Sequence, residues 1–273
     1  MEKPEPGARN QAQSQPEPAL APLQPGQLVA GRYRVIAPIG QGGMGAVYRV
    51  EQVFLRQQFA LKTISGAGVS DSVWRRFEKE AKAAALLDHP NLVKVRDFGL
   101  EDVPFFVMDL VEGETLSALI KANQAAPGSR LSQAAILEIF AQVSRALGYA
   151  HSRGVIHRDI KPSNIIVANS ADAKSLKVKV VDFGIAKLVS AEALESMALT
   201  RTGEVFGTPF YMSPEQCLGG AIDHRADIYS VGCVLFEALT GLPPFMGDGA
   251  LTTIMKQQSE AAPTLREASL GRS

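Results

Sequence analysis

The first third of the chain alternates short β-branched and aromatic runs with turn-forming residues. Such runs cover residues 32–40, 46–50 and 58–64, and two more follow at residues 92–99 and 104–111. Runs of this length and composition, bounded by glycine and other turn formers, are typical of the strands of an antiparallel meander. The pattern predicts a small β-sheet at the N-terminal end of the fold.

A helical pattern separates the third strand-like run from the fourth. It begins at Ser70 or Asp71, either of which can cap the first turn. Its apolar positions recur at a spacing near 3.6 residues, at Val73, Phe77, Ala84 and Leu87. Glu80 falls on the same apolar stripe. Because a carboxylate on the buried side of a helix costs several kcal/mol unless a cation meets it, Glu80 requires a basic partner from elsewhere in the chain.

Helical periodicity dominates after residue 112. One amphipathic stripe consists of Ile136, Phe140, Val143 and Leu147. Residues 228–239 are apolar nearly all round, which is typical of a buried helix. These patterns predict an α+β fold: a small antiparallel β lobe with one main helix (residues 31–111) precedes a larger α-helical lobe (residues 112–273).

The N-terminal segment differs in composition from the rest of the chain. Its first 28 residues hold six of the 16 prolines and are otherwise rich in Gln, Glu and Ala. Such a segment has too little apolar mass to offset the entropy of ordering it. We therefore expect residues 1–30 to form a disordered tail.

Charge and cysteine content narrow the function classes. The 28 basic residues equal the 28 acidic ones in number, so the bulk attraction that nucleic-acid and anionic-membrane binders use is missing. Two cysteines exclude a disulfide scaffold and a zinc site of four cysteines. No apolar stretch reaches the roughly 18 residues that cross a bilayer, and the N-terminus lacks the apolar run of a signal peptide. We expect a cytoplasmic protein without nucleic-acid or membrane contact.

A glycine-rich stretch lies between the first two strand-like runs. Gly40, Gly42 and Gly45 form the pattern G-x-G-x-x-G-x-V, which occurs in phosphate-binding loops but also in plain hairpins. A dinucleotide-binding fold needs a helix at the last glycine, whereas here a strand continues, so a dinucleotide-dependent oxidoreductase is disfavoured. The glycines therefore belong to a hairpin that can lie over phosphates. Lys62, on the third strand, is the natural cation for Glu80.

A second cluster of motifs carries the strongest signal. Residues 157–164 read HRDIKPSN, and DFG follows at residues 182–184. Together with GQGGMGAVY, HPNLV, GTPFYMSPEQ and DIYSVGCVLFEALTGLPPF, these motifs resemble the eukaryotic-like (Hanks-type) protein kinases, and most closely their bacterial serine/threonine branch. The resemblance runs from about Tyr33 to the C-terminus. It implies a bilobal kinase fold and transfer of the γ-phosphate of ATP, with Mg²⁺ or alternatively Mn²⁺, to Ser and Thr hydroxyls of protein substrates.

The resemblance also implies roles for individual residues. Asp159 would accept the proton of the substrate hydroxyl, and Lys161 would neutralise charge on the transferred phosphoryl group. Asn164 and Asp182 supply only oxygen ligands, which suit a hard ion such as Mg²⁺. Phosphoryl transfer depends on placement and charge neutralisation more than on covalent help, so this set of residues fits the reaction.

The nucleotide site implied by the resemblance draws on both ends of the first lobe. Lys62 would grip the α- and β-phosphates while Glu80 holds Lys62, and backbone amides of the glycine hairpin would close over the triphosphate. Met108 occupies the gatekeeper position, before the backbone groups that face the purine. The ATP-binding residues are then Ile39, Gly40, Gln41, Gly42, Gly43, Met44, Gly45, Val47, Ala60, Lys62, Met108, Asp109, Val111 and Ile166. For the apolar slot of Val47, Ala60 and Ile166, a place in the ordinary core is an equally compatible interpretation.

Regulation is suggested by the segment between Asp182 and Glu215. The family counterpart of Arg158 pairs with a phosphorylated activation loop, and Thr200 and Thr202 lie in that part of this chain. A phosphate there adds a charge of about −2, which can order the loop against the arginine. We predict autophosphorylation at one or both threonines, including between two copies in trans; otherwise they are plain loop hydroxyls. Thr208 belongs to the substrate-docking loop of the resemblance.

The C-terminus departs from the family pattern. The kinase pattern continues beyond Ser273 with two helices and an arginine that pairs with the position of Glu215, and no such arginine is recognisable here. We therefore expect an incomplete helical lobe with part of the helix at residues 228–239 exposed. A catalytically impaired nucleotide-binding or interaction module is the alternative function under that interpretation.

Overall fold

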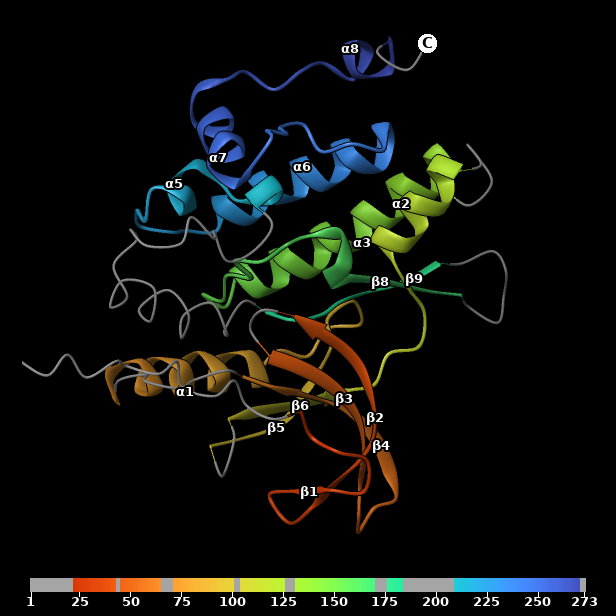
Figure 1. Cartoon of the computed structure of the whole chain (residues 1–273), viewed down its shortest axis with the longest axis vertical. Helices are drawn as coiled ribbons and strands as arrows, with labels where there is room; N and C mark the ends of the chain where they lie inside the picture. Colours follow the sequence, from red (N-terminus) through yellow and green to blue (C-terminus); the bar gives the residue numbers. More distant parts are fainter. Residues whose placement is uncertain are drawn as a thin grey trace, which may run out of the picture.

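The N-terminal half of the fold is a curled antiparallel sheet, as the sequence pattern predicts. The computed structural model describes residues 22–42, 45–64, 71–100, 104–125, 131–169, 176–183 and 209–270. The sheet has the strand order β1-β2-β3-β4-β6-β5. Its strands are β1 (Leu28–Val29), β2 (Tyr33–Gly42), β3 (Gly45–Gln52), β4 (Gln57–Thr63), β5 (Val95–Gly99) and β6 (Phe105–Asp109). Helix α1 (Asp71–Ala85) lies between this sheet and the helical lobe (Figure 1).

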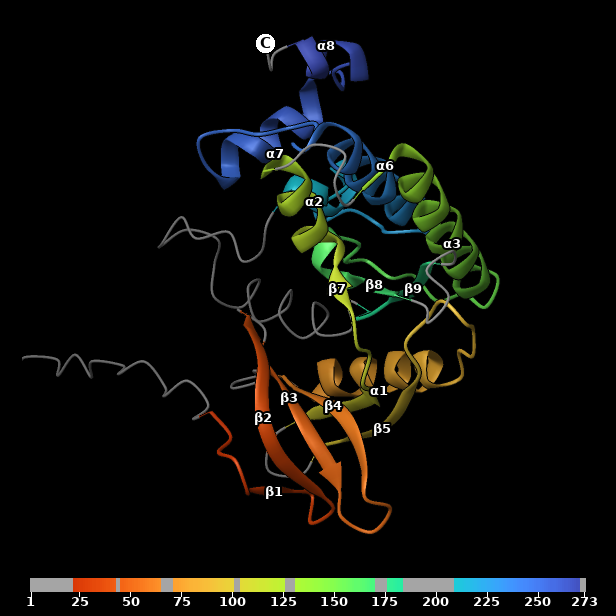
Figure 2. The same cartoon turned by 90° about the vertical axis from the view of Figure 1, so that its right-hand side faces the viewer.

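The second lobe is mainly helical, with a small sheet at the side that faces the first lobe (Figure 2). That sheet has the order β7-β8-β9, with β7 (Glu114–Thr115), β8 (Ile165–Asn169) and β9 (Leu176–Val180). Its helices are α2 (Leu116–Ala125), α3 (Gln133–His151), α5 (Pro214–Cys217), α6 (Arg225–Thr240), α7 (Ala250–Ser259) and α8 (Leu265–Leu270), with 3₁₀ turns η1 (Pro162–Asn164) and η2 (Pro209–Tyr211). The predicted α+β fold of two lobes is therefore confirmed.

Two clusters of buried apolar side chains form the hydrophobic core of the protein. The smaller packs on the outer face of the first sheet, around Val50 and Leu61, both fully buried. The larger runs without a break from the inner face of that sheet, at Phe106, through α1 at Ala81 to α3 at Ile139. Because this cluster spans both lobes, packing of apolar side chains sets how the two halves of the site between them are spaced.

The ordered sheet starts before Gly31, where the sequence pattern placed its beginning. Leu28 and Val29 pair with Arg34 and Tyr33, and the Val29 side chain is buried. Residues 22–30 therefore belong to the first lobe and not to a disordered tail. Two residues are too short a run for a strand signal, and their pairing depends on the hairpin that follows.

Helix α6 is buried along one side and exposed along the other. Val234 is fully buried, whereas 59% of Ile228 is exposed. The helix ends at Gly241, whose φ of +81° is the left-handed conformation that favours glycine at this position.

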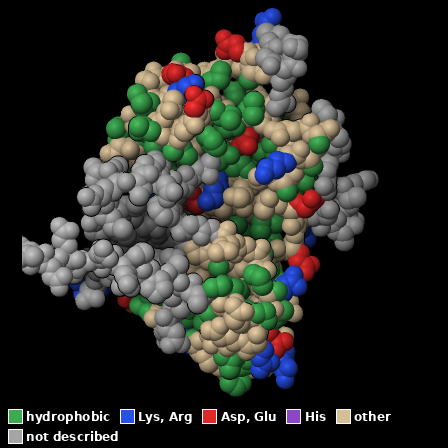
Figure 3. Space-filling model, viewed as in Figure 1, with side chains coloured by type: hydrophobic (Ala, Val, Ile, Leu, Met, Phe, Trp, Pro, Cys, Tyr) green, Lys and Arg blue, Asp and Glu red, His purple; other side chains and the backbone are tan. Residues whose placement is uncertain are grey.

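Among the described residues, no helix combines the length and the hydropathy that a membrane crossing needs. On the face of the molecule in Figure 3, basic and acidic side chains are interspersed.

Candidate active site

The glycine hairpin joins β2 to β3 at the edge of the space between the lobes. Gly42 pairs with Gly45, and Gly43 and Met44 lie outside the described residues. Gly45 has a φ of +136°, and a Cβ atom built there would lie 1.9 Å from the carbonyl oxygen of Thr63. Only glycine fits this position, because its backbone conformation and the closeness of β4 both exclude a side chain.

Strand register brings the predicted purine-binding residues to one face of the first sheet. Ala60 lies opposite Met108, and Val47 lies opposite Lys62. Residues directly opposite each other point to the same face, and so do residues two apart on one strand. This face is turned toward the helical lobe, where Met108 packs against the larger cluster. The remaining predicted members are Ile39, exposed, and Gly40, Gln41, Val111 and Ile166, which are exposed or half-buried.

The strand end at Asp109 is held by an arginine. Arg96 donates from Nε to Oδ1 of Asp109 at 2.6 Å and from Nη2 to Oδ2 at 2.9 Å. The paired carboxylate raises the pKa of Arg96. This two-pronged contact orients the segment whose backbone groups would face a purine.

Lys62 is nearly buried, and its ammonium bonds Asp182. Its Nζ lies 2.5 Å from Oδ2 of Asp182 and also contacts Oδ1. Asp182 itself has a φ of +63°, an uncommon conformation for a residue with a side chain. The two residues therefore form one charged unit at the junction of the lobes.

Glu80 has a basic partner, as the helical pattern requires, but the partner is not Lys62. Arg158 lies within 3.4 Å of Glu80, from Nη1 to Oε1, and both side chains are half-buried. The predicted Lys62–Glu80 pair is therefore wrong in this structure. The physical reason is that two cations lie within reach of two acids, and Lys62 is engaged with Asp182.

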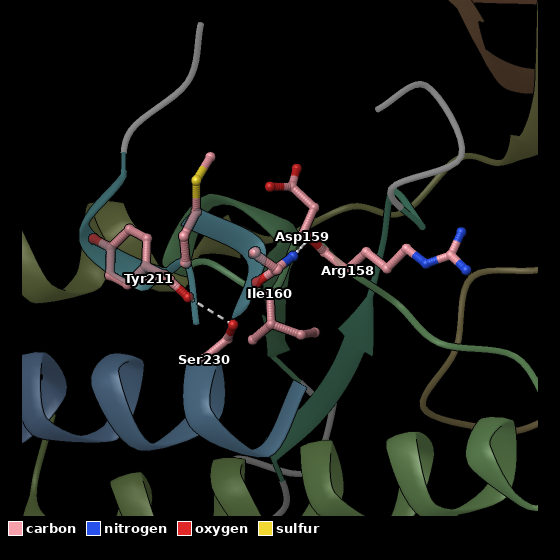
Figure 4. A pocket seen from close by; sticks show the side chains of 7 residues that line it. Arg158, Asp159, Ile160, Tyr211 and Ser230 are labelled. Carbon is pink, nitrogen blue, oxygen red and sulfur yellow. Dashed lines mark hydrogen bonds between the residues drawn. The ribbon is translucent and has the colours of Figure 1, made fainter. Parts of the chain in front are cut away.

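In the catalytic loop, residues 157–164, two side chains contact Asp159. Lys161 places its Nζ 2.9 Å from Oδ2 of Asp159. Asn164, which is buried, donates from Nδ2 to the carbonyl oxygen of Asp159 at 2.8 Å and to Oδ2 at 3.2 Å. The Asp159 carboxylate is thereby fixed by two neighbours, while Figure 4 shows it and the Arg158 side chain leaving the loop in different directions.

A buried carboxylate on α6 supports the loop from below. Asp227 accepts hydrogen bonds from the backbone amides of His157 and Arg158, each at 2.8 Å, and its Oδ2 lies 2.7 Å from Nε2 of His151. His157 is fully buried against Phe183, and burial lowers the pKa of its imidazole. Asp227 is not among the site residues predicted from the sequence, because no local motif or periodicity marks it.

The segment at residues 209–217, which lies beside Asp159, is held by several hydrogen bonds. A small hollow lies between it and the catalytic loop, lined by Asp159, Tyr211 and Gln216 among others. Ser230 donates to the carbonyl oxygen of Tyr211 at 2.6 Å (Figure 4), and the Tyr211 hydroxyl lies 2.6 Å from Glu237. Burial raises the pKa values of Tyr211 and Glu237. Gln257 of α7 donates to the carbonyl oxygen of Pro209. Thr200, Thr202 and Thr208 lie outside the described residues.

The oxygen donors near Asp159 fit a hard divalent ion. The Nδ2 of Asn164 is used by Asp159, and its Oδ1 accepts no hydrogen bond within the part of the chain that the structure describes. Asp182 adds a carboxylate on the neighbouring segment, where the Val181 amide donates to the Asn164 carbonyl at 2.9 Å. In this structure the Asp182 carboxylate is shared with the Lys62 ammonium. Oxygen-only donors of this kind suit Mg²⁺.

Comparison with known proteins agrees with this geometry. The family model described as "Protein kinase domain" matches residues 33–269 of the chain. The chain is 43% identical to "Serine/threonine-protein kinase pkn3" of Myxococcus xanthus, with 87% of this chain and 43% of that protein covered. It is 39% identical to "Serine/threonine-protein kinase PrkC" of Bacillus subtilis, with 88% and 35% covered. It therefore spans less than half the length of these relatives.

Solved structures show the same architecture. The PknI kinase domain of Mycobacterium tuberculosis superposes with a TM-score of 0.68 at 28% sequence identity, and the match covers 92% of this chain and 86% of that one. The fold of this chain is thus shared with an experimentally determined domain.

Proposed function

Because the chain belongs to the protein kinase family, we propose that it transfers the γ-phosphate of ATP to Ser and Thr hydroxyls of proteins. The observation that carries this proposal is the contact of Lys161 and Asn164 with Asp159, next to the Lys62–Asp182 pair. The reaction needs a base, a cation beside the transferred group and a site for a metal, and these residues supply all three.

The roles follow from the chemistry of each group. Asp159 accepts the proton of the substrate hydroxyl, and its carboxylate is held for that purpose by Asn164. Lys161 neutralises charge that develops on the phosphoryl group. Lys62 supplies a cation to the α- and β-phosphates.

Asn164 and Asp182 would hold Mg²⁺, with Mn²⁺ as the other candidate. When bound, such an ion neutralises phosphate charge and orients the leaving group. Glu80 acts by holding a cation of the site in place. In this structure that cation is Arg158. The predicted purine slot, formed by Val47 and Ala60 on the inner face of the first sheet and by Ile166 on β8, supplies apolar contact to adenine.

The decisive test is transfer of labelled phosphate from Mg-ATP to the protein itself and to a generic Ser/Thr substrate. We expect transfer that is lost in Asp159→Asn, because that variant has no carboxylate to accept the proton. A matched control is Asp248→Asn, which makes the same change outside the site and leaves transfer intact. Stoichiometric ATP binding without transfer would instead support a nucleotide-binding module.

We also propose regulation by autophosphorylation of Thr200 or Thr202 in trans, with Arg158 as the cation that meets the phosphate. Arg158 already pairs with a carboxylate, which supports its capacity to bind an anion. Phosphopeptide mapping after incubation with Mg-ATP tests this directly. An alanine replacement of both threonines that leaves phosphate uptake and activity unchanged would contradict it.

Two free cysteines, Cys217 and Cys233, support a cytoplasmic location, which we propose as well.

A further inference from the structure

Gln216 connects the segment beside Asp159 to the catalytic loop. Its Nε2 donates to the carbonyl oxygen of Arg158 at 2.9 Å, and its Oε1 accepts from the backbone amide of Ser213 at 3.0 Å. A carbonyl can only accept and an amide N–H can only donate, so the orientation of the Gln216 amide follows from its partners. The residue also lines the hollow beside Asp159.

The bond matters because Arg158 has a strained backbone. Its φ is +64°, in the left-handed region that residues with side chains seldom adopt. Such a conformation persists only where neighbouring contacts hold it. The amide N–H of Arg158 is held by Asp227 at 2.8 Å, and its carbonyl oxygen is held by Gln216. The peptide groups on both sides of Arg158 are therefore fixed from two different elements.

The second of these peptide groups leads directly into Asp159. If its plane turns, the Asp159 carboxylate turns with it, and the contacts from Lys161 and Asn164 must readjust. Proton acceptance requires a base within hydrogen-bond reach of the hydroxyl, so a small rotation lowers the rate. Most of the predicted ATP-binding residues lie in the other lobe, so ATP binding does not pass through this contact.

We propose that Gln216 is a positioning residue for catalysis, which holds the Arg158–Asp159 peptide so that Asp159 faces the substrate hydroxyl. This inference rests on the proposed kinase activity. It assigns to one side chain two separable tasks: Oε1 completes a capping box at the start of α5, and Nε2 orients the catalytic loop.

Two substitutions separate these tasks. Gln216→Glu keeps an oxygen for the Ser213 amide and removes the donor to Arg158, while Gln216→Ala removes both. We expect kcat to fall about tenfold in both variants, which corresponds to about 1.4 kcal/mol, with the KM for ATP unchanged. The melting temperature should fall further in Gln216→Ala than in Gln216→Glu, since only Gln216→Ala also loses the cap. Agreement of the two kcat values excludes an effect of the added charge.

The matched control is Gln258→Glu, which makes the same change at an exposed glutamine of α7 and leaves kcat unchanged. A wild-type kcat in Gln216→Glu overturns the inference, as does a kcat that follows the melting temperature. Amide hydrogen exchange over residues 155–165 tests the contact without turnover, and we expect faster exchange in Gln216→Glu than in Gln258→Glu. Equal exchange would overturn the inference, whereas wild-type protein without phosphate transfer would overturn the kinase proposal.

Discussion

Asp227 is the carboxylate whose removal should disturb the fold and the site most. Its side chain is 1% exposed and accepts three hydrogen bonds, from His151 and from the backbone amides of His157 and Arg158. A hydrogen bond to a charged group contributes about 1.5–3 kcal/mol, and the desolvation of a buried carboxylate offsets several kcal/mol of that gain. Removing one member of such a buried charged network costs about 3–5 kcal/mol.

We therefore expect Asp227→Ala to lower the free energy of unfolding by about 4 kcal/mol. For a chain of this size, that loss corresponds to a drop in melting temperature of about 8–16 °C. The assay is denaturant unfolding followed by circular dichroism, with thermal unfolding beside it. kcat should fall as well, because the Arg158 amide loses its acceptor and the adjoining Asp159 loses its placement.

Asp223→Ala is the matched control, since Asp223 is an acid at the same end of α6. Its carboxylate is 46% exposed and pairs with Arg225, which lowers its pKa to about 2. An exposed pair of this kind contributes little to stability, because water screens it. If Asp227→Ala does not fold, Asp227→Asn keeps the shape and should still lose more stability than the control. Equal losses for Asp227→Asn and Asp223→Ala would refute the reasoning.

Three further predictions concern other parts of the molecule. Gly45→Ala should destabilise the protein by about 3 kcal/mol, because its Cβ would meet the Thr63 carbonyl at 1.9 Å; a loss under about 1 kcal/mol in denaturant unfolding would contradict this. Burial lowers the pKa of His157 below 6.5, so the unfolded chain takes up a proton that the folded protein excludes. Stability from this group is present above pH 6.5 and falls as the pH drops below it, and His157→Phe should flatten the pH dependence of unfolding between pH 5 and 8. Burial raises the pKa of the Cys233 thiol to about 12, so a maleimide should label the half-buried Cys217 first in native protein, and mass mapping that finds Cys233 labelled equally fast would argue against it.

Strands and glycine positions could be predicted from sequence because their signals are local. Short runs of β-branched and aromatic residues between turn formers predicted the strands, and the continuation of β3 after Gly45 distinguished a phosphate-binding hairpin from a dinucleotide fold. The residues of the catalytic loop were identified through their ordered motifs. These features depend on a few neighbouring positions, which a sequence displays directly.

Contacts between elements that are far apart in the sequence could not be predicted in this way. Asp227 follows Arg158 by 69 residues, and Gln216 follows it by 58. Neither pairing has a periodic or compositional signal, because each depends on how α5 and α6 pack beneath the catalytic loop. The strand at Leu28 and Val29 was missed for a related reason, since a two-residue strand is defined by its partner and not by its own sequence.

The pairing of charges shows where sequence reasoning reaches its limit. The pattern required a cation for Glu80, and the structure has one, but it is Arg158 instead of Lys62. At an effective dielectric constant near 20, two unit charges 4 Å apart interact by about 4 kcal/mol, and that energy halves when the separation doubles. A few ångströms of movement between α1 and the catalytic loop therefore decides which cation Glu80 meets. That spacing is set by the apolar cluster that joins the lobes, so packing of uncharged side chains determines the electrostatics of the site.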